Sequence, residues 1–306
     1  QNTSLLVINR CNWKMSTSIL DISAHKHGNY HKYYTFHPTT SRMDVIGKYS
    51  LFYNLWNMQG QPKIFAILDV GCNEGDLSIE IFQLARLQIP QNVQCILLGV
   101  DLDPSLIELA NQRHKVGDLA DIVDFRTMDF MNGEESSRDI NSYMQAFGIT
   151  GFSFVSLFSI TMWIHLNFGD TGLHTFLSNS VKFLLPNVGS LLVEPQPWKC
   201  YKNAVKRCRK LGMEKPLHFD DIKPQDMDVY ITQYLLGQIP SSLGMKSCQN
   251  LGQEKWGRSI LLFHLLPNVC DMEVMRPQKI LEEDDTIDDE NATDGDDTTM
   301  CKKRRN

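Results

Sequence analysis

Short hydrophobic runs of strand length alternate with stretches of helical periodicity through the middle of the chain. Most of these runs are nearly continuous, as is typical of parallel strands that are covered on both faces. The predicted strands occupy residues 64–70, 95–100, 121–128, 152–160 and 190–194, and a late strand occupies 258–265. The predicted helices occupy residues 104–115, 136–147, 172–185 and 229–236. This alternation predicts an α/β fold with a doubly wound, mostly parallel sheet and helices on both of its faces.

The first predicted strand ends in a turn that is bracketed by glycines. The turn reads Asp69-Val-Gly71-Cys-Asn73-Glu-Gly75, and a helix is expected after it. Because glycine has no Cβ, the backbone at Gly71 and Gly75 can adopt positive φ and let a ligand approach the main chain closely. The spacing is D-x-G-x-x-x-G and not the G-x-G-x-x-G of dinucleotide sites, which disfavours nicotinamide and flavin cofactors. The turn therefore indicates a different nucleotide-like cofactor.

Acidic residues follow the next two strands. Asp101 and Leu102 come directly after the second strand, where a doubly wound sheet holds ribose hydroxyls. Asp129 and Phe130 end the third strand, and a carboxylate beside an aromatic ring suits the amino group and ring face of adenine. The order of glycine turn, helix, strand and acid resembles that of class I S-adenosylmethionine-dependent methyltransferases. An ordinary strand-to-helix turn with unrelated acids is the alternative.

Polar and aromatic residues also follow the fourth and fifth strands. The chain reads TMWIHLN at 161–167 and EPQPW at 194–198. Open α/β sheets bind ligands beyond the carboxyl ends of their strands, so both segments are expected to meet the substrate. For His165, a structural role with satisfied hydrogen bonds is the alternative.

The segment that precedes the first strand, residues 28–60, begins with an unusual composition. It reads GNYHKYYTFHP at 28–38, which combines aromatic rings, histidines and turn residues, and Arg42 follows. This composition suits a lid over the cofactor. An N-terminal helix that packs on the sheet is the alternative. Residues 1–27 have no clean periodicity and are expected to form an irregular arm.

A basic segment without any acid, WKCYKNAVKRCRKLG, spans residues 198–212. In a helix, the spacing of four of its lysines would place them along one face: Lys199, Lys202, Lys206 and Lys210. Beside the expected cleft, such a stripe indicates binding of phosphates. A basic surface helix without a ligand is the alternative. We expect this helix to open an insert at 198–246, with a loop at 220–228.

The formal net charge of −6 is confined to the end of the chain. Residues 271–306 hold twelve acids and six bases, which leaves 24 of each in residues 1–270. The acidic stretch at 282–297 has almost no large apolar side chains, so a disordered tail is predicted. The basic cluster at 302–305 is interpreted as solvated, with nuclear import or masking of the protein itself as alternatives.

The eight cysteines form no C-x-x-C pair, so neither a disulfide framework nor a zinc site is indicated, and no metal cofactor is expected. We expect reduced thiols in a cytoplasmic protein, with the nucleus as an alternative. No stretch resembles a signal peptide, and no apolar run approaches the ~20 residues that span a bilayer. A membrane partner is therefore not expected.

The chain resembles the Bicoid-interacting-protein family of RNA 5′-phosphate methyltransferases in motifs spread over about residues 28–266. These motifs are GNYHKYY, LDVGCNEGDLS, VDLDP, MDFMN, SITMWIHLNFGD, LLVEPQPWKCYK, RKLG and WGRSILLF. The stretches SITMWIHLN and EPQPWKCY are the most specific. The resemblance implies a methyltransferase domain at 28–270, a seven-stranded class I fold, and S-adenosylmethionine as cofactor with S-adenosylhomocysteine as product. Within the family, the chain most resembles the members that methylate the 5′-monophosphate of small RNA. This resemblance implies histidine tRNA and microRNA precursors as substrates.

The resemblance also implies that one set of residues contacts the cofactor: Tyr33, Arg42, Gly71, Asn73, Asp101, Leu102, Asp129, Phe130 and Phe158. Tyr33 and Arg42 would touch its methionine end, Asp101 its ribose and Asp129 its adenine. Phe158 stands where the 5′-monophosphate members have methionine, so only an apolar contact is carried over.

The expected acceptor, a 5′-phosphate oxygen, is already anionic at neutral pH. Methyl transfer to it requires no strong base, and alignment and desolvation can supply the rate. The donors expected to position the phosphate are His37, Thr161, His165 and Lys199. Thr35 stands where the 5′-monophosphate members have arginine, so His37 or the basic helix would have to compensate.

Three other functions stay open. One is capping of a 5′-triphosphate end at its γ-phosphate, and another is methylation of a carboxylate or hydroxyl on a small molecule. The third is a non-enzymatic RNA-binding module that keeps the fold. The intact Gly71, Asp101 and Asp129 argue against this module, because such a protein would not need cofactor contacts.

Overall fold

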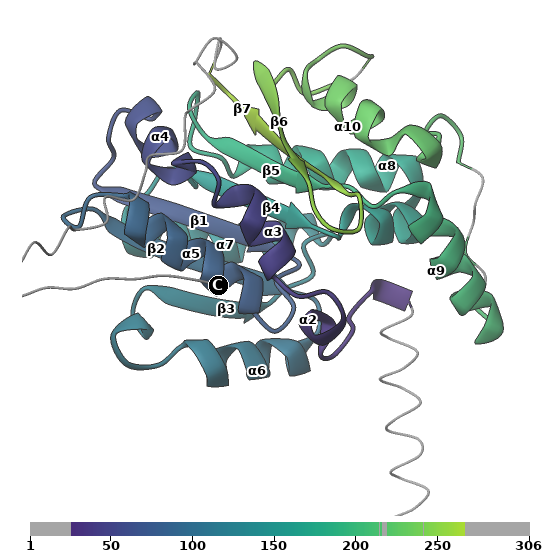
Figure 1. The fold of residues 1–306 in the computed structure, drawn as a ribbon, viewed down its shortest axis with the longest axis horizontal. Helices are drawn as coiled ribbons and strands as arrows, with labels where there is room; N and C mark the ends of the chain where they lie inside the picture. Colours follow the sequence, from purple (N-terminus) through teal and green to yellow (C-terminus); the bar gives the residue numbers. More distant parts are fainter. Residues whose placement is uncertain (1–25, 214, 216–218, 241, 267–306) are drawn as a thin grey trace, which may run out of the picture.

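The computed structural model describes residues 26–213, 215, 219–240 and 242–266, and a seven-stranded sheet runs through its centre (Figure 1). Its strand order is β3-β2-β1-β4-β5-β7-β6. The strands are β1 (Ile64–Val70), β2 (Gln94–Asp101), β3 (Val123–Thr127), β4 (Phe154–Phe158), β5 (Ser190–Glu194), β6 (Ser247–Gln253) and β7 (Ser259–His264). The first five pair in parallel, and β7 runs antiparallel to both β5 and β6. The predicted fold class is confirmed.

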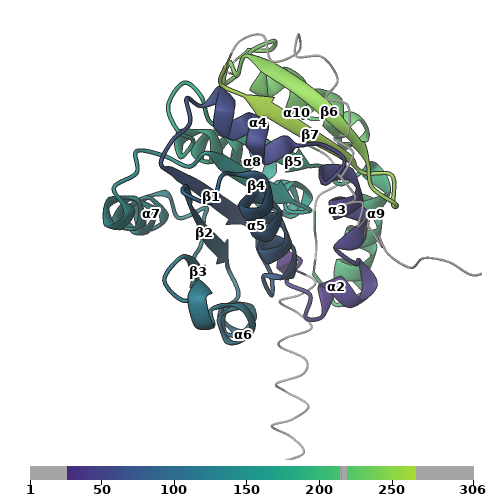
Figure 2. The same cartoon turned by 60° about the vertical axis from the view of Figure 1, so that its left-hand side comes forward.

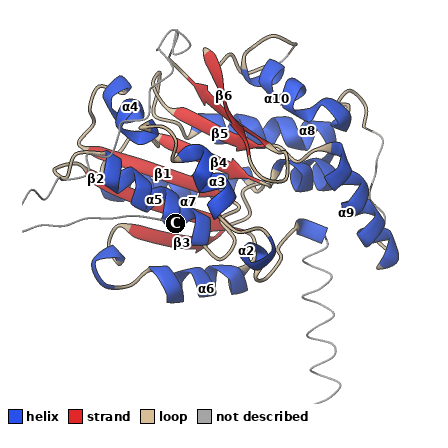
Figure 3. Cartoon of the chain, viewed as in Figure 1, coloured by secondary structure: helices blue, strands red, loops and turns tan. Residues whose placement is uncertain are grey.

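Helices cover both faces of the sheet (Figures 2 and 3). Those after the first strand are α5 (Asp76–Gln88), α6 (Pro104–His114), α7 (Gly133–Phe147), α8 (Thr161–Lys182), α9 (Trp198–Lys210) and α10 (Met227–Leu235). Alternate residues of β1 enter two separate cores: Phe65 and Ile67 lie with α5 and α6, whereas Ala66 and Leu68 lie with α7, α8 and α10. Both faces of the strand are therefore buried, which explains its continuous apolar sequence.

The N-terminal segment contains three helices, α2 (Tyr33–Phe36), α3 (Thr40–Ile46) and α4 (Leu51–Met58). Helix α4 packs on the sheet, where the ring centroid of Phe52 lies 6.1 Å from that of Phe65 and 5.3 Å from that of Phe154. Helix α2 instead lines the cavity that is described below. The alternative of a helix that packs on the sheet thus applies to α4, and the lid over the cofactor stays a prediction for the part that contains α2.

Two elements were not predicted. Helix α8 has a kink at Gly169, where φ is 67°; the part after the kink corresponds to the predicted helix at 172–185, whereas the helical part from Thr161 to the kink was not expected. Strand β6, which was not predicted, is a polar edge strand whose sequence SCQNLGQ has no apolar run. A short 3-10 turn at Pro224–Asp226 lies within the predicted loop at 220–228. Helix α9 agrees with the predicted basic helix.

The N-terminal arm up to residue 25 and the acidic tail lie outside the described residues. Within the described part, no helix is both long enough and apolar enough to cross a membrane.

Candidate cofactor and substrate site

The glycine turn after β1 has the geometry of a ligand cradle. Gly71 and Gly75 have φ of 81°, and Asn73 has φ of 54°. A Cβ at Gly71 would lie 2.7 Å from Cδ1 of Ile160, so a side chain would collide with the start of α8 as well as strain the backbone. The N–H groups of Gly71 and Cys72 donate to the carbonyl of Val100 at 2.8 and 3.1 Å, which fixes the turn against the end of β2.

Asp69 holds the turn from below. Its carboxylate is buried and accepts hydrogen bonds from the hydroxyls of Ser78 in α5, at 2.5 Å, and Ser156 in β4, at 2.7 Å. Burial raises the pKa of Asp69, and both hydroxyl bonds oppose that shift. Asp69 therefore links β1 to α5 and β4 next to the turn, and it does not line the cavity.

Asp101, at the tip of β2, faces the same space. One carboxylate oxygen accepts the backbone N–H of Asn73 at 2.9 Å, and the other accepts that of Asp103 at 3.0 Å. Burial raises the pKa of Asp101 to about 6, although both backbone bonds oppose this shift. Each carboxylate oxygen can accept a further hydrogen bond, so the group can still receive hydroxyls from a ligand.

A cavity of about 440 Å³ opens above the turn, and a smaller one of about 120 Å³ adjoins it. The two share several lining residues, including Gly71, Asp101 and Trp163. The large cavity is lined by the predicted residues Tyr33, Arg42, Gly71, Asn73, Asp101 and Phe158. The small one is lined by the predicted residues Leu102, Asp129 and Phe130. All nine predicted cofactor residues thus converge on one cleft, and their contact with a cofactor stays a prediction.

The floor of the large cavity carries two arginines on one glutamate. Arg42 donates two hydrogen bonds to the carboxylate of Glu194, from Nε at 2.5 Å and from Nη2 at 3.0 Å. Arg258, from the turn between β6 and β7, donates to the same glutamate through Nη1 at 2.9 Å. Burial alone would raise the pKa of Glu194, but the charges and hydrogen bonds of Arg42 and Arg258 outweigh it and lower the pKa. Glu194 is therefore an anion at neutral pH.

Arg42 keeps one group free for a ligand. Its Nη1 is buried and has no hydrogen-bond partner among the described residues, although its other groups also bind Tyr33 and Ser159. An unpaired buried guanidinium N–H that lines a cavity suits a carboxylate. The predicted role of Arg42 at the cofactor's methionine end fits this observation.

His37 lines the cavity between two aromatic rings. Its ring centroid lies 4.9 Å from that of Tyr33 and 4.7 Å from that of Trp256. Burial, followed by the charges of Arg258 and Arg42, lowers its pKa, so the ring is neutral at pH 7. His37 can therefore offer a hydrogen bond to a phosphate but not a charge.

Three of the four predicted phosphate donors line neither cavity, and two of these three, Thr161 and His165, are buried. The hydroxyl of Thr161 donates to the side chain of Gln196 at 3.1 Å. His165 is fully buried, and its two ring nitrogens contact the hydroxyl of Tyr201 at 3.1 Å and the carboxylate of Asp170 at 2.7 Å. With both nitrogens engaged, His165 has the structural role that was its alternative. The prediction that these residues face a phosphate does not fit their positions.

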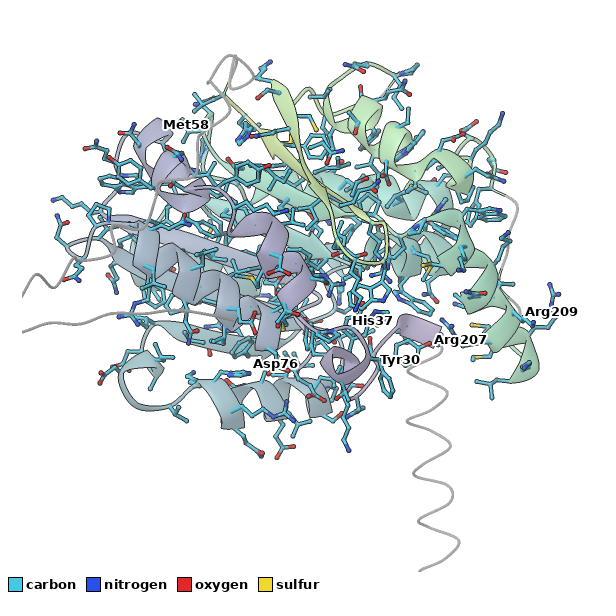
Figure 4. All side chains as sticks on the ribbon, in the orientation of Figure 1. Tyr30, His37, Met58, Asp76, Arg207 and Arg209 are labelled. Atoms are coloured by element: carbon cyan, nitrogen blue, oxygen red, sulfur yellow. The ribbon has the colours of Figure 1, made fainter. Side chains whose placement is uncertain are left out.

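The basic helix meets the cavity with a different face from the predicted one. All four lysines of the stripe are exposed, and none lines the cavity: Lys199, Lys202, Lys206 and Lys210. The face that does line it carries Cys200, Asn203 and Arg207, which are spaced at i, i+3 and i+7. The Arg207 guanidinium lies 5.9 Å from the ring centroid of Tyr30 (Figure 4). The i, i+3, i+7 spacing of Cys200, Asn203 and Arg207 is present in the sequence, but the prediction followed the more regular spacing of the lysines.

The N-terminal segment forms one wall of the cavity. At Gly28, where φ is 85°, a Cβ would come within 2.3 Å of Nε1 of Trp163, so only glycine fits between the segment and α8. The Asn73 side chain donates to the carbonyl of Tyr30 at 3.2 Å, and the Lys32 N–H donates to Glu74 at 2.9 Å. Two hydrogen bonds thus join this wall to the glycine turn.

Within the described residues, no group of three or more His, Cys, Asp or Glu side chains is placed to hold a metal ion.

Comparison with known proteins gives a consistent picture. Residues 152–265 match the family model described as Bicoid-interacting protein 3 (Bin3). The chain is 35% identical over 260 residues to the pre-miRNA 5′-monophosphate methyltransferase of Xenopus laevis, covering 82% of this chain and 96% of that protein. It is 37% identical over 244 residues to the RNA 5′-monophosphate methyltransferase of Homo sapiens, covering 77% and 79%.

More distant similarities extend to other methyltransferases. The U6 snRNA methylphosphate capping enzyme Amus of Drosophila melanogaster is 30% identical over 223 residues, covering 69% of this chain and 64% of that protein. Among solved structures, the magnesium protoporphyrin IX methyltransferase from Synechocystis PCC 6803 has 12% identity and a TM-score of 0.41, covering 81% of this chain and 95% of that chain. The last likeness is too remote to bear on function.

Proposed function

Because the chain belongs to the Bicoid-interacting protein 3 family, we propose that it transfers a methyl group from S-adenosylmethionine to the 5′-monophosphate of RNA. The observation that carries this proposal is the cleft above the glycine turn, where an acid at the tip of β2 and two arginines near the tip of β5 face one space. Relatives at 35% and 37% identity are named for methylation of 5′-monophosphate ends.

The residues of the cleft fit this cofactor. The free Nη1 of Arg42 suits its carboxylate, and Asp101 has acceptor capacity left for ribose hydroxyls. Phe130 and Asp129 line the small cavity, where an adenine ring would find an apolar face and an acceptor. When bound, S-adenosylmethionine supplies an electrophilic methyl group: a phosphate oxygen forms the new O–C bond, and the S–C bond breaks with its electron pair retained on sulfur.

The protein's own groups need only hold the phosphate, because its oxygen is already a nucleophile at neutral pH. The neutral ring of His37 would donate a hydrogen bond to the phosphate without adding a positive charge. The phosphate oxygen would then keep its negative charge uncompensated by this residue and stay nucleophilic. Residues of the N-terminal segment and α8 line the cavity on two sides, where they would restrict how the reacting groups can lie.

RNA beyond its first phosphate would leave the cavity along α9. Arg207 lines the cavity (Figure 4), and the four exposed lysines of the stripe lie along the same helix. Cations along such a path bind the RNA backbone irrespective of sequence. From the family resemblance and the names of the relatives, we extend the proposal to histidine tRNA and to microRNA precursors as substrates in the cytoplasm.

The experiment that tests this function is radiolabelled methyl transfer to one RNA prepared with a 5′-monophosphate, a 5′-triphosphate and a 5′-hydroxyl. We expect labelling of the monophosphate form alone. Preference for the triphosphate would move the protein to the capping members, and equal labelling of the 5′-hydroxyl form would rule out phosphate methylation.

A further inference from the structure

The two arginines of the cavity floor share Glu194 and Ser159 but reach them from opposite sides of β5. Along the edge of the sheet, the tips run from β2 with Asp101, through β1 with the glycine turn, to β4, β5 and finally β7. Arg42 lies beside the ring of Phe158, at the tip of β4, with its guanidinium 5.9 Å from the ring centroid. Arg258 precedes β7 directly, at the far end of this series. The predicted cofactor residues at the strand tips thus lie over β3, β2, β1 and β4. Arg258 approaches from the β7 side and shares Ser159 and Glu194 with Arg42.

Arg258 is held rigidly. The carboxylate of Glu254 accepts the backbone N–H groups of Arg258 and Trp256 at 3.2 and 3.0 Å, which closes the turn between β6 and β7. The guanidinium Nη1 then donates to Ser159 at 2.6 Å and to Glu194 at 2.9 Å. Backbone and side chain are therefore both fixed, and binding a ligand would cost little ordering entropy.

The other edge of this guanidinium makes no hydrogen bond to the described residues, and its Nε has only the longer ion pair with Glu254. Arg258 is 8% exposed and lines the large cavity. Among the described residues, its Nε is buried without a hydrogen-bond partner and lies 4.0 Å from Glu254, and no partner is found for Nη2. Nε and Nη2 form one side of the planar guanidinium fork, which matches two oxygens of a phosphate.

The surroundings of this edge also suit a phosphate. His37 lines the same cavity, and its ring packs edge-to-face on Trp256, which belongs to the same turn as Arg258. The buried Nδ1 of His37 also lacks a hydrogen-bond partner among the described residues. Arg42, in contrast, has both its Nε and Nη2 on Glu194, so its fork is already occupied.

We propose that Arg258 binds the terminal 5′-phosphate through its Nε and Nη2 groups, with His37 as the neighbouring neutral donor, while Arg42 serves the cofactor carboxylate. This inference rests on the proposed function, because it assigns the acceptor site of the same reaction. It places the phosphate at the β7 end of the cleft, where neither Thr161 nor His165 reaches the cavity.

The test compares Arg258→Gln with the parent and with Lys255→Gln, a matched control that removes an exposed cation from the same turn outside the cavity. Binding of one RNA with a 5′-monophosphate or a 5′-hydroxyl is measured together with S-adenosylhomocysteine affinity in the absence of RNA. We expect Arg258→Gln to lose about 10- to 100-fold of the preference for the phosphorylated end and most of the methyl transfer. Its S-adenosylhomocysteine affinity should stay within about threefold, and the control should match the parent.

Retention of the full phosphate preference in Arg258→Gln would overturn the inference. So would a loss of S-adenosylhomocysteine affinity as large as that of Arg42→Gln, because Arg258 would then belong to the cofactor site. If Arg258→Gln does not fold, Arg258→Lys keeps the charge opposite Glu194 but lacks the fork, and an undiminished phosphate preference in that variant would also overturn it. A parent protein that neither prefers nor methylates the phosphorylated end would instead refute the proposed function.

Discussion

Lowering the pH from 7 to 5 should weaken cofactor binding through Asp101. Its burial raises the pKa to about 6, even though the N–H groups of Asn73 and Asp103 both bind the carboxylate. Ribose hydroxyls donate to the ionised form, so binding selects that form. With a pKa of about 6, the ionised fraction falls from roughly nine-tenths at pH 7 to roughly one-tenth at pH 5. The affinity should therefore fall about tenfold, or about 1.4 kcal/mol.

The assay is calorimetric titration with S-adenosylhomocysteine between pH 5 and 8, on the parent and on Asp101→Asn. At pH 7 the variant should bind about 1.5 kcal/mol more weakly, because hydroxyl bonds to a charged acceptor become bonds to a neutral one. Its affinity should also change less with pH. His27 and His37 line the cavity and titrate too, but they remain in the variant, so the difference between the two profiles isolates Asp101.

Parallel pH profiles for parent and variant would refute this reasoning and assign the pH effect to the histidines. Unfolding through Asp101 is not a competing explanation. The folded-state pKa of Asp101 lies above its unfolded value of 3.8, so the folded state binds more protons between about pH 6 and 4. This group therefore adds stability as the pH falls through that range.

Two further changes test the RNA path along α9. Arg207→Ala should raise the KM for RNA about fivefold or more without changing S-adenosylhomocysteine affinity, whereas Arg209→Ala, whose side chain points away at the outer part of the helix (Figure 4), should have little effect. Equal effects of the two would remove Arg207 from the path. Replacing Lys202, Lys206 and Lys210 together by Glu should raise KM and flatten its dependence on salt concentration. An unchanged salt dependence would make the stripe a solvated surface.

The cofactor half of the cleft could be predicted because its signals are local in sequence. The glycine turn and the acid at the tip of β2 each follow a recognisable strand, and parallel pairing brings neighbouring tips together: Val70 pairs with Val100, one residue before Asp101. Short-range patterns therefore implied a three-dimensional arrangement. The same logic identified Asp129 and Phe130 after the third strand.

The substrate half could not be predicted in the same way. Arg258 reaches Tyr33 across 225 positions of sequence, and the strand that leads to it, β6, is too polar to show an apolar run. His165 is adjacent to a strand tip, yet the helix that begins at Thr161 turns it inward. Here, tertiary packing decides which polar residue faces the ligand, and a local pattern does not contain that information.

The hydroxyl of Ser159 has a consequence for how this site tolerates variation. Ser159 has φ of 54°, and its oxygen binds Arg42, Arg258, Glu194 and Tyr33. Groups from three distant segments, namely the N-terminal segment, the end of β5 and the turn between β6 and β7, thus share one oxygen atom, so a substitution at any of them changes the surroundings of the others. Effects of paired substitutions should be strongly non-additive there, and replacements compatible with one partner would demand compensating changes in the rest. Substitutions in this network are therefore tolerated only when several of its residues change together, even if the same substitution would be neutral at another position of the protein.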